Sequence, residues 1–241
     1  KGGAALQYGY AFRTYSDGWY SWIVSAGGRM VNEEYTKSTM SDPAAVKAVQ
    51  FLADLTTRYK TALAMDDATA KSMGDPGDLF RTGRLAMMLQ DVAASYKFAE
   101  SKELRWDIAP MPLVKKGAPR ANRLWTNTWA LPKGAKHPEA AWRFLRFVGG
   151  PEGQKISADK HLGIPAMKSI ANSPVFLDGI PEHKQVFLDS FQYGQAFPTF
   201  PEMQEYLAIY VRELDSVWTG QRKAAEACAA IDKEANSVLF N

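Results

Sequence analysis

The run from Phe80 to Met88, together with the segment from Trp106 to Pro112 that follows it, leaves few folds open to this chain. A short helix that ends at Gly83 leads directly into an apolar strand, and the polar pair Gln90 and Asp91 follows this strand. We expect a second strand over 106–112, closed by its prolines. Helices that alternate with short strands in this way indicate an α/β architecture.

Composition narrows the class of protein further. The chain has 241 residues, of which 46% are apolar and 12% aromatic, enough for a sizeable core in one large or two small domains. No apolar run reaches the roughly 18 residues of a membrane-spanning helix. The 29 basic and 26 acidic residues are interspersed, unlike the concentrated basic charge of a nucleic-acid-binding protein. The single cysteine, Cys228, excludes an internal disulfide and reads as a buried small residue on an apolar helix face.

Helical spacing of apolar residues predicts two long helices. Asp42 and Pro43 suit the cap and the first position of a helix whose buried stripe continues to Tyr59. A longer helix near the end of the chain precedes Gly220, which separates it from a last helix. The expected stripe of this longer helix consists of Met203, Tyr206, Leu207, Tyr210, Leu214, Val217 and Trp218.

The middle of the chain predicts a mixture of loops, strands and helices. Residues 64–78 are acidic and contain glycine, so we expect a loop there, and residues 124–131 read as a strand. A helix with Pro138 in its first turn is expected to end at Gly149 and Gly150. Another helix begins at Pro151 and continues to about Lys160. The opening Lys1-Gly-Gly does not look like a signal peptide, and we expect it to come from the middle of a longer protein.

Six segments of the chain resemble, in the same order, those of one protein family. They are Trp19 with Gly27-Gly28, then 42–60, 80–88 with 106–112, 137–145 with 151–154, 197–203 and 218–220. The family is that of the extracytoplasmic sugar-binding proteins of ABC importers, the maltose-binding-protein-like family. This resemblance implies a type II periplasmic-binding-protein fold, in which two α/β lobes are joined by hinge strands near residues 124–132 and 160–172.

The resemblance also implies a domain organisation. Family members begin with an N-terminal lobe of which this chain lacks most. Residues 1–124 would form the first part of the C-terminal lobe, and residues 173–241 would form its second part. Between them, residues 125–172 would supply a hinge strand and the segment that returns to the N-terminal lobe.

The function implied by the resemblance is solute transport without catalysis. Such a protein is the substrate-binding component of an ABC importer, closes two lobes on a carbohydrate, and delivers it to the permease subunits in the membrane. We expect a mono- or oligosaccharide as the solute, and we expect no cofactor, no metal and no nucleic acid. The implied protein is a monomer and is periplasmic or an extracytoplasmic lipoprotein.

A sugar site needs aromatic faces for stacking and planar polar groups that hydrogen-bond to hydroxyls. Many family members have a Gly-Pro-Trp-like stretch where this chain reads Asp91-Val-Ala93, so we considered Tyr96 as a replacement for the missing tryptophan. Core packing is the competing explanation for the aromatic residues, and for Tyr206 it is the stronger one. The ligand-binding residues implied by the resemblance are Trp19, Tyr20, Trp22, Gln90, Asp91, Tyr96, Trp125, Asn127, Thr128 and Tyr206.

Three alternatives stay open at the level of sequence. On the same fold, an anionic solute such as glycerol phosphate or a sugar acid would require arginine forks, for which the candidates are Arg13, Arg29, Arg120 and Arg123. A sensor or chemoreceptor partner would use the same closure. A carbohydrate-active enzyme would need two carboxylates across a cleft, and no pair is singled out among the 26 acidic residues. The histidines His137, His161 and His183 are too far apart in sequence to indicate a metal site.

Overall fold

The structure is a computed structural model that describes residues 7–14 and 18–240, without the side chains of residues 67, 70, 95 and 96. The chain divides into two compact units. Unit 1 comprises residues 1–89, 111–124 and 193–241, and unit 2 comprises residues 90–110 and 125–192.

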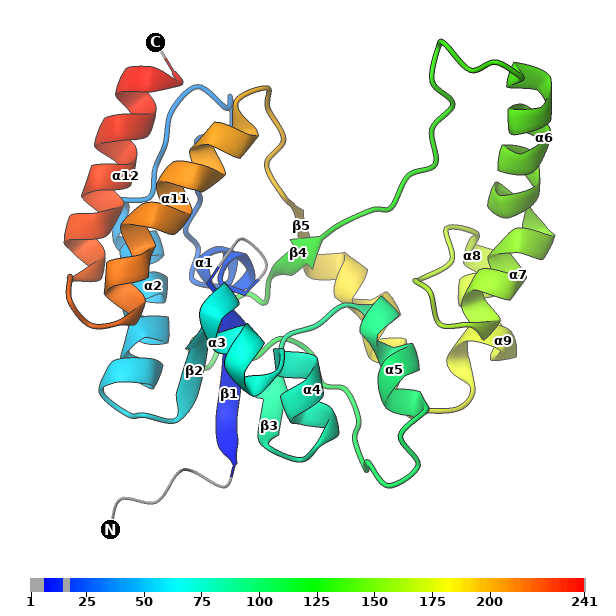
Figure 1. Cartoon of the computed structure of the whole chain (residues 1–241), viewed down its shortest axis with the longest axis horizontal. Helices are drawn as coiled ribbons and strands as arrows, with labels where there is room; N and C mark the ends of the chain where they lie inside the picture. Colours follow the sequence, from blue (N-terminus) through cyan, green and yellow to red (C-terminus); the bar gives the residue numbers. More distant parts are fainter. Residues whose placement is uncertain (1–6, 15–17, 241) are drawn as a thin grey trace. The chain divides into compact units, whose positions relative to one another are not determined.

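A three-stranded parallel sheet lies in unit 1, with strand order β2-β1-β3. Strand β1 (Tyr8–Arg13) lies in the centre and pairs with β2 (Ala62–Met65) and β3 (Leu85–Met88). Parallel strands need crossover connections. Two helices connect β1 to β2, and two more connect β2 to β3. Figure 1 shows these three strands side by side in unit 1.

The helices of unit 1 bury most of the apolar surface of the chain. Helices α2, α11 and α12 pack against one another, and α1 packs against α2 (Figure 1). The core between them contains Trp19, Ile23, Leu52, Tyr210 and Ile231, all fully buried. The helices of this unit are α1 (Tyr20–Ser25), α2 (Pro43–Thr57), α3 (Asp67–Met73), α4 (Pro76–Arg81), α11 (Met203–Trp218) and α12 (Ala224–Val238).

A second, two-stranded parallel sheet also belongs to unit 1. It pairs β4 (Asn122–Leu124) with β5 (Gly194–Ala196), so that Leu124 lies opposite Ala196. The chain passes into unit 2 directly after β4 and returns directly before β5. This short ladder therefore stands at two of the points where the chain crosses between the units.

Unit 2 consists of short helices around a small core. Val92, Ala158, Ile170 and Phe176 are buried together there. No residue of α6 is buried, and Trp142, Phe144 and Phe147 of this helix are each about half exposed. The helical segments are η1 (Val92–Ala94), α5 (Ser95–Ala99), α6 (Pro138–Gly149), α7 (Pro151–Asp159), α8 (Lys168–Ala171), α9 (Pro174–Leu177), α10 (Gln185–Asp189) and η2 (Ser190–Tyr193), whose last residue is counted in unit 1.

Several expectations about local structure are confirmed. Helix α4 is followed by Gly83, at φ 70°, and by the apolar strand β3. Helix α2 begins at Pro43, although the side chain of Asp42 makes no capping hydrogen bond. In α11 the expected stripe is buried except for Leu207, which is half-buried. Cys228 is fully buried, and burial raises the pKa of its thiol to about 12.

Four expectations about local structure are wrong. The buried stripe of α2 does not continue to Tyr59, because the helix ends at Thr57 and Tyr59 is 55% exposed. Residues 64–78 are not one loop, because β2 ends at Met65 and α3 and α4 follow. No strand forms over 106–112, where Pro110 and Pro112 lack the amide donors that a sheet requires. The expected strand 124–131 ends at Leu124, and residues 125–132 have no regular secondary structure.

The expected division of the chain at residues 124 and 172 stays a prediction. The compact units group residues 90–110 and 173–192 with residues 125–172, rather than with the flanking segments. None of the helices in the described part of the chain has both the length and the apolar character that a membrane crossing requires.

Candidate functional site

Two of the residues expected to bind ligand lie in the core of unit 1. Trp19 is 0% exposed and stacks on Tyr210, with ring centroids 3.8 Å apart. Tyr206 is also 0% exposed, and its hydroxyl donates to the carbonyl of Met30 at 2.8 Å. Burial raises the pKa of Tyr206 far above its ordinary value. A side chain without exposed surface offers no face to a solute, so we leave both residues out of the proposed site.

Tyr20 and Trp22, on the short helix α1, are also engaged with their own unit. The Tyr20 hydroxyl donates to the carbonyl of Ala196 at 2.8 Å, and burial raises the pKa of this tyrosine to about 12. Trp22 is half-buried, and its Nε1 donates to the hydroxyl of Tyr10 at 3.1 Å. Of these aromatic residues, Trp22 alone keeps substantial exposed surface, and its role in binding stays a prediction.

The polar residues that follow β3 lie in unit 2 and are exposed. Asp91 Oδ1 accepts a hydrogen bond from the amide of Ala94 at 3.1 Å, which caps η1. Gln90 Oε1 accepts from the amide of Asp91 at 3.1 Å. The Tyr96 side chain, considered as a replacement for the missing tryptophan, lies outside the described residues. Gln90 and Asp91 thus present polar groups to solvent, and their role in binding stays a prediction.

The segment from Trp125 to Trp129 carries the most exposed aromatic surface near the expected hinge. Trp125 is 63% exposed, and Asn127 and Thr128 beside it are also exposed. Trp129 is 66% exposed and makes an edge contact with Phe144 of α6, with ring centroids 6.0 Å apart. Our sequence reasoning did not include Trp129, although two tryptophans four residues apart in an otherwise polar stretch are a signal for it. Indole faces next to amide and hydroxyl groups are the chemistry that a sugar requires.

The arginines of the anionic alternative all have partners already. Arg13 forms an ion pair with Asp75 at 3.6 Å, and Arg29 forms one with Glu33 at 2.7 Å. The other two guanidinium groups lie over aromatic rings, Arg120 over Tyr193 at 5.8 Å and Arg123 over Phe197 at 4.9 Å from the ring centroid. Nothing in this arrangement converges on a common anion site, so an anionic solute is not favoured over a neutral sugar.

One exposed cluster in unit 2 has residue types that bind metals. Ligand atoms of Asp107, Glu182 and His183 lie within 4.8 Å of one another. However, His183 Nδ1 is already hydrogen-bonded to Asp107 Oδ2, and the His183 amide donates to Asp107 Oδ1 at 3.2 Å. All three side chains are exposed, so an ion pair accounts for the cluster without a metal.

The ion pair between Asp107 and His183 should shift the pKa values of both side chains. Its hydrogen bond to Asp107 raises the pKa of His183. Burial of the Asp107 carboxyl opposes its ionisation, but hydrogen bonds from His183 and from backbone amides outweigh burial and lower the pKa of Asp107. The contribution of His183 to the free energy of unfolding is therefore complete below about pH 6.5 and is lost as the pH rises through its raised pKa. The contribution of Asp107 is present above about pH 4 and is lost on acidification.

Histidine NMR resonances followed against pH test this pair. We expect His183 to titrate at higher pH than His161, since burial and the nearby Lys184 lower the pKa of His161. The substitution Asp107→Asn should lower the midpoint of His183 and leave that of His161 in place. An unchanged His183 midpoint in this variant would show that the ion pair does not form in solution.

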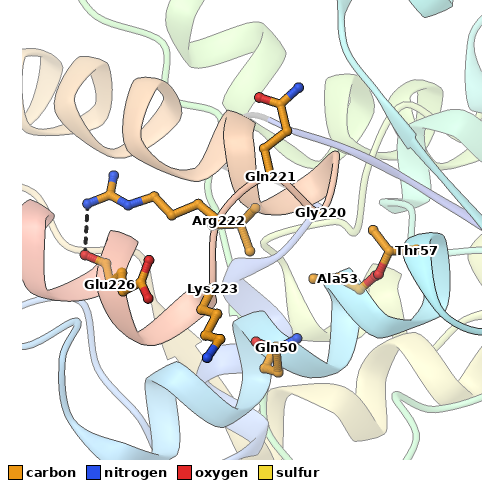
Figure 2. Close-up of a pocket in the computed structure, with 9 residues that line it drawn as sticks. Gln50, Ala53, Thr57, Gly220, Gln221, Arg222, Lys223 and Glu226 are labelled. Carbon is orange, nitrogen blue, oxygen red and sulfur yellow. Dashed lines mark hydrogen bonds between the residues drawn. The ribbon is translucent and has the colours of Figure 1, made fainter.

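One groove lies in unit 1, and none of the residues expected to bind a sugar is among those that line it. It has a volume of about 380 Å³ and is lined by α2, the end of α11 and the loop and first turn leading into α12 (Figure 2). Arg222 at its edge donates to Glu213 Oε2 at 2.6 Å and to the carbonyl of Glu226 at 3.0 Å, the latter drawn as a dashed line in Figure 2. Its polar groups therefore hold the turn between the two helices together.

The fold of the chain is that of known sugar-binding proteins. It superposes with a TM-score of 0.83 on an ABC substrate-binding protein from Listeria monocytogenes in complex with cycloalternan, at 22% identity, covering 98% of this chain and 60% of that one. It superposes with a TM-score of 0.80 on the maltose/maltodextrin-binding domain of Bdellovibrio bacteriovorus bound to maltotriose, at 18% identity, covering 98% of this chain and 61% of that one. The expected α/β class and solute-binding fold are thereby confirmed.

Sequence similarity assigns the family. The model of the bacterial extracellular solute-binding protein family matches residues 1–155, and the chain belongs to this family. It is 21% identical over 159 residues to the galactooligosaccharide-binding protein of Bacillus subtilis, a match that covers 66% of this chain and 36% of the relative. The chain thus spans about three fifths of the length of the solved structures that it matches. Its match to the galactooligosaccharide-binding protein covers about a third of the length of that protein.

Proposed function

We propose that the protein is the substrate-binding component of an ABC importer, that it binds a carbohydrate, and that it delivers the carbohydrate to a membrane permease. The observation that carries this proposal is the family match over residues 1–155 together with a fold shared over 98% of the chain with proteins solved in complex with oligosaccharides. Binding of a solute would favour the closed form of such a protein because the closed form makes more contacts with it.

The exposed segment 125–129 is the part of the proposed site that the structure describes best. Trp125 offers an indole face to the C–H surface of a sugar ring. Asn127 offers an amide that can donate and accept, and Thr128 offers a hydroxyl that can do both, so together they can hydrogen-bond to adjacent sugar hydroxyls. Gln90 and Asp91 supply further planar polar groups from a second segment of unit 2.

We propose that the protein releases its solute unchanged. The family consists of solute-binding proteins, which supports binding without turnover. We further propose an extracytoplasmic location, a permease as the protein partner, a monomeric state, and no cofactor or nucleic acid. Within this location the protein is either periplasmic or an extracytoplasmic lipoprotein, as the resemblance implies.

A panel of solutes tests the proposal through thermal unfolding of the complete protein. The panel contains neutral oligosaccharides such as maltotriose and galactooligosaccharides, sugar acids and glycerol phosphates. A true ligand at about a hundred times its dissociation constant adds about 2.7 kcal/mol to the free energy of unfolding, which raises Tm by several degrees. We expect this rise with a neutral oligosaccharide, and we expect chromatography to recover the sugar unchanged.

Two variants connect the result to the proposed residues. Trp125→Ala should weaken the affinity by about 1–3 kcal/mol because it removes the stacking surface, whereas Trp142→Ala on α6, at a similarly exposed tryptophan of the same unit, should leave the affinity unchanged. A rise with anions alone would replace the carbohydrate by an anionic solute. Conversion of the sugar into a product would contradict the transport function.

A further inference from the structure

Helix α1 holds the strand through which the chain leaves unit 1. Ser25 Oγ donates to the carbonyl of Ala121 at 2.6 Å, a buried hydrogen bond. One turn earlier on the same helix face, Ser21 Oγ accepts from the amide of Arg123 at 3.2 Å. These two serines fix the backbone on both sides of Asn122, immediately before the chain passes into unit 2 after Leu124.

The same helix holds the strand through which the chain returns. The Tyr20 hydroxyl donates to the carbonyl of Ala196, the last residue of β5, at 2.8 Å. The Tyr20 ring meets the Phe197 ring edge-on, with centroids 4.8 Å apart. The guanidinium of Arg123 lies over the same Phe197 ring, 4.9 Å from its centroid. Strand β5 is thus tied to α1 directly and to β4 through Arg123.

The side chain of Leu124 in β4 also occupies the space that a side chain at position 194 of β5 would need. A Cβ atom added to Gly194 would lie 2.2 Å from Leu124 Cγ and 2.4 Å from its Cδ1. Glycine at position 194 therefore lets Leu124 pack directly on the backbone of β5. A shift of either strand would therefore disturb both the pairing of β4 with β5 and this contact.

We propose that Tyr20, Ser21 and Ser25 form a clamp that makes β4 and β5 part of the rigid body of unit 1. Bending of the chain at these two crossings is then confined to residues outside 121–124 and 194–197. The consequence for transport rests on the proposed function: a joint that is already ordered loses less conformational freedom when a solute closes the protein, so the clamp favours tight binding. Tyr20 is, in this view, a positioning residue rather than a group that touches the solute.

Hydrogen exchange of the complete protein without solute tests the clamp. Tyr20→Phe keeps the ring contact with Phe197 and removes only the hydrogen bond. Amides of residues 121–124 and 194–197 should exchange about threefold to tenfold faster in this variant, the change expected from the loss of about one net hydrogen bond. The matched control is Tyr206→Phe, which loses a tyrosine-to-carbonyl hydrogen bond of the same 2.8 Å length in the same unit. Its exchange at the two strands should equal that of the unmodified protein.

Distances between spin labels give the second readout. Labels on Lys155→Cys in α7 and Lys233→Cys in α12, with Cys228→Ala in the background, report on unit 2 and unit 1 respectively. The distribution of distances should become wider in Tyr20→Phe, and in the double variant Ser21→Ala with Ser25→Ala, than in Tyr206→Phe. If the double variant does not fold, the single variant Ser25→Ala replaces it in this measurement. Equal exchange and equal widths in all folded variants would overturn the clamp, and neither measurement depends on finding the solute.

Discussion

Replacing Trp19 by alanine is expected to lower the free energy of unfolding by about 3–5 kcal/mol, as do other tryptophan deletions in well-packed cores. Trp19 is completely buried in unit 1 and stacks on Tyr210, which is itself completely buried. The substitution removes this stacking contact and leaves a cavity between α1 and α11 that rigid neighbours cannot fill. Urea unfolding followed by circular dichroism measures the loss.

Two further substitutions separate a core role from a binding role for Trp19. Trp19→Phe keeps a ring against Tyr210 and removes an indole Nε1 that has no partner among the described residues, so it should cost much less than alanine. Trp129→Ala, at a tryptophan that is 66% exposed, should change the free energy of unfolding by less than about 0.5 kcal/mol. If Trp19→Ala instead abolished sugar binding at unchanged stability, the residue would belong to the site and our assignment to the core would be wrong.

The elements that sequence predicted well are those with long apolar periodicity. In α11, buried residues recur at helical spacing from Met203 to Trp218, and in α12 from Ala224 to Ala235. Such stripes specify both the helix and the face that it buries. Glycines at positive φ mark two of the boundaries, Gly83 after α4 and Gly220 between α11 and α12.

The segments that sequence predicted poorly depend on partners that are distant in the chain. Residues 125–129 contain tryptophan and threonine, residue types that strands favour, but strand β4 pairs with β5 only up to Leu124. A strand exists through its pairing, which residue types alone do not supply. Helix α6 shows a related limit, because Ala141, Leu145 and Val148 lie at helical spacing and are nevertheless only half-buried.

The candidate site illustrates why aromatic residues mislead. Trp19 and Trp125 each have a hydroxyl residue and a second tryptophan within the next four positions, yet one is 0% and the other 63% exposed. The difference arises because Trp19 precedes α1, whose face packs against the core of unit 1, whereas Trp125 lies just beyond the last paired residue of β4. Long-range packing decides between core and surface, and a single sequence carries little information about it.

A carboxylate on α12 carries the second large effect on stability. Asp232 Oδ1 accepts from the hydroxyl of Ser38 at 2.5 Å and from the amide of Met40 at 2.7 Å. Asp232 Oδ2 accepts from the amide of Ser41 at 2.8 Å and from the hydroxyl of the same serine. The Ser38 hydroxyl also lies 2.9 Å from the hydroxyl of Tyr206. One side chain thus anchors the loop before α2 to the last helix of the chain.

Asp232→Ala is expected to lower the free energy of unfolding by about 2–4 kcal/mol. Hydrogen bonds to a charged group contribute about 1.5–3 kcal/mol each, and the bonds from Ser38 and Met40 are shielded from solvent more than those from Ser41, which water can replace. The loss should appear in urea unfolding. It should be accompanied by faster hydrogen exchange of the amides of residues 38–41, because their acceptors disappear.

The outcome in two companion variants shows whether the carboxylate or merely its charge matters. Asp232→Asn keeps one oxygen acceptor and should lose less stability than alanine, since Ser38 and Met40 share the same oxygen Oδ1. Asp215→Ala removes an exposed aspartate from the neighbouring helix α11 and should change the free energy of unfolding by less than about 0.5 kcal/mol. Equal losses in Asp232→Ala and Asp215→Ala would mean that the net charge of this face controls stability. In that case the loop from Ser38 to Ser41 would be held by its apolar contacts, chiefly the fully buried Met40, rather than by Asp232.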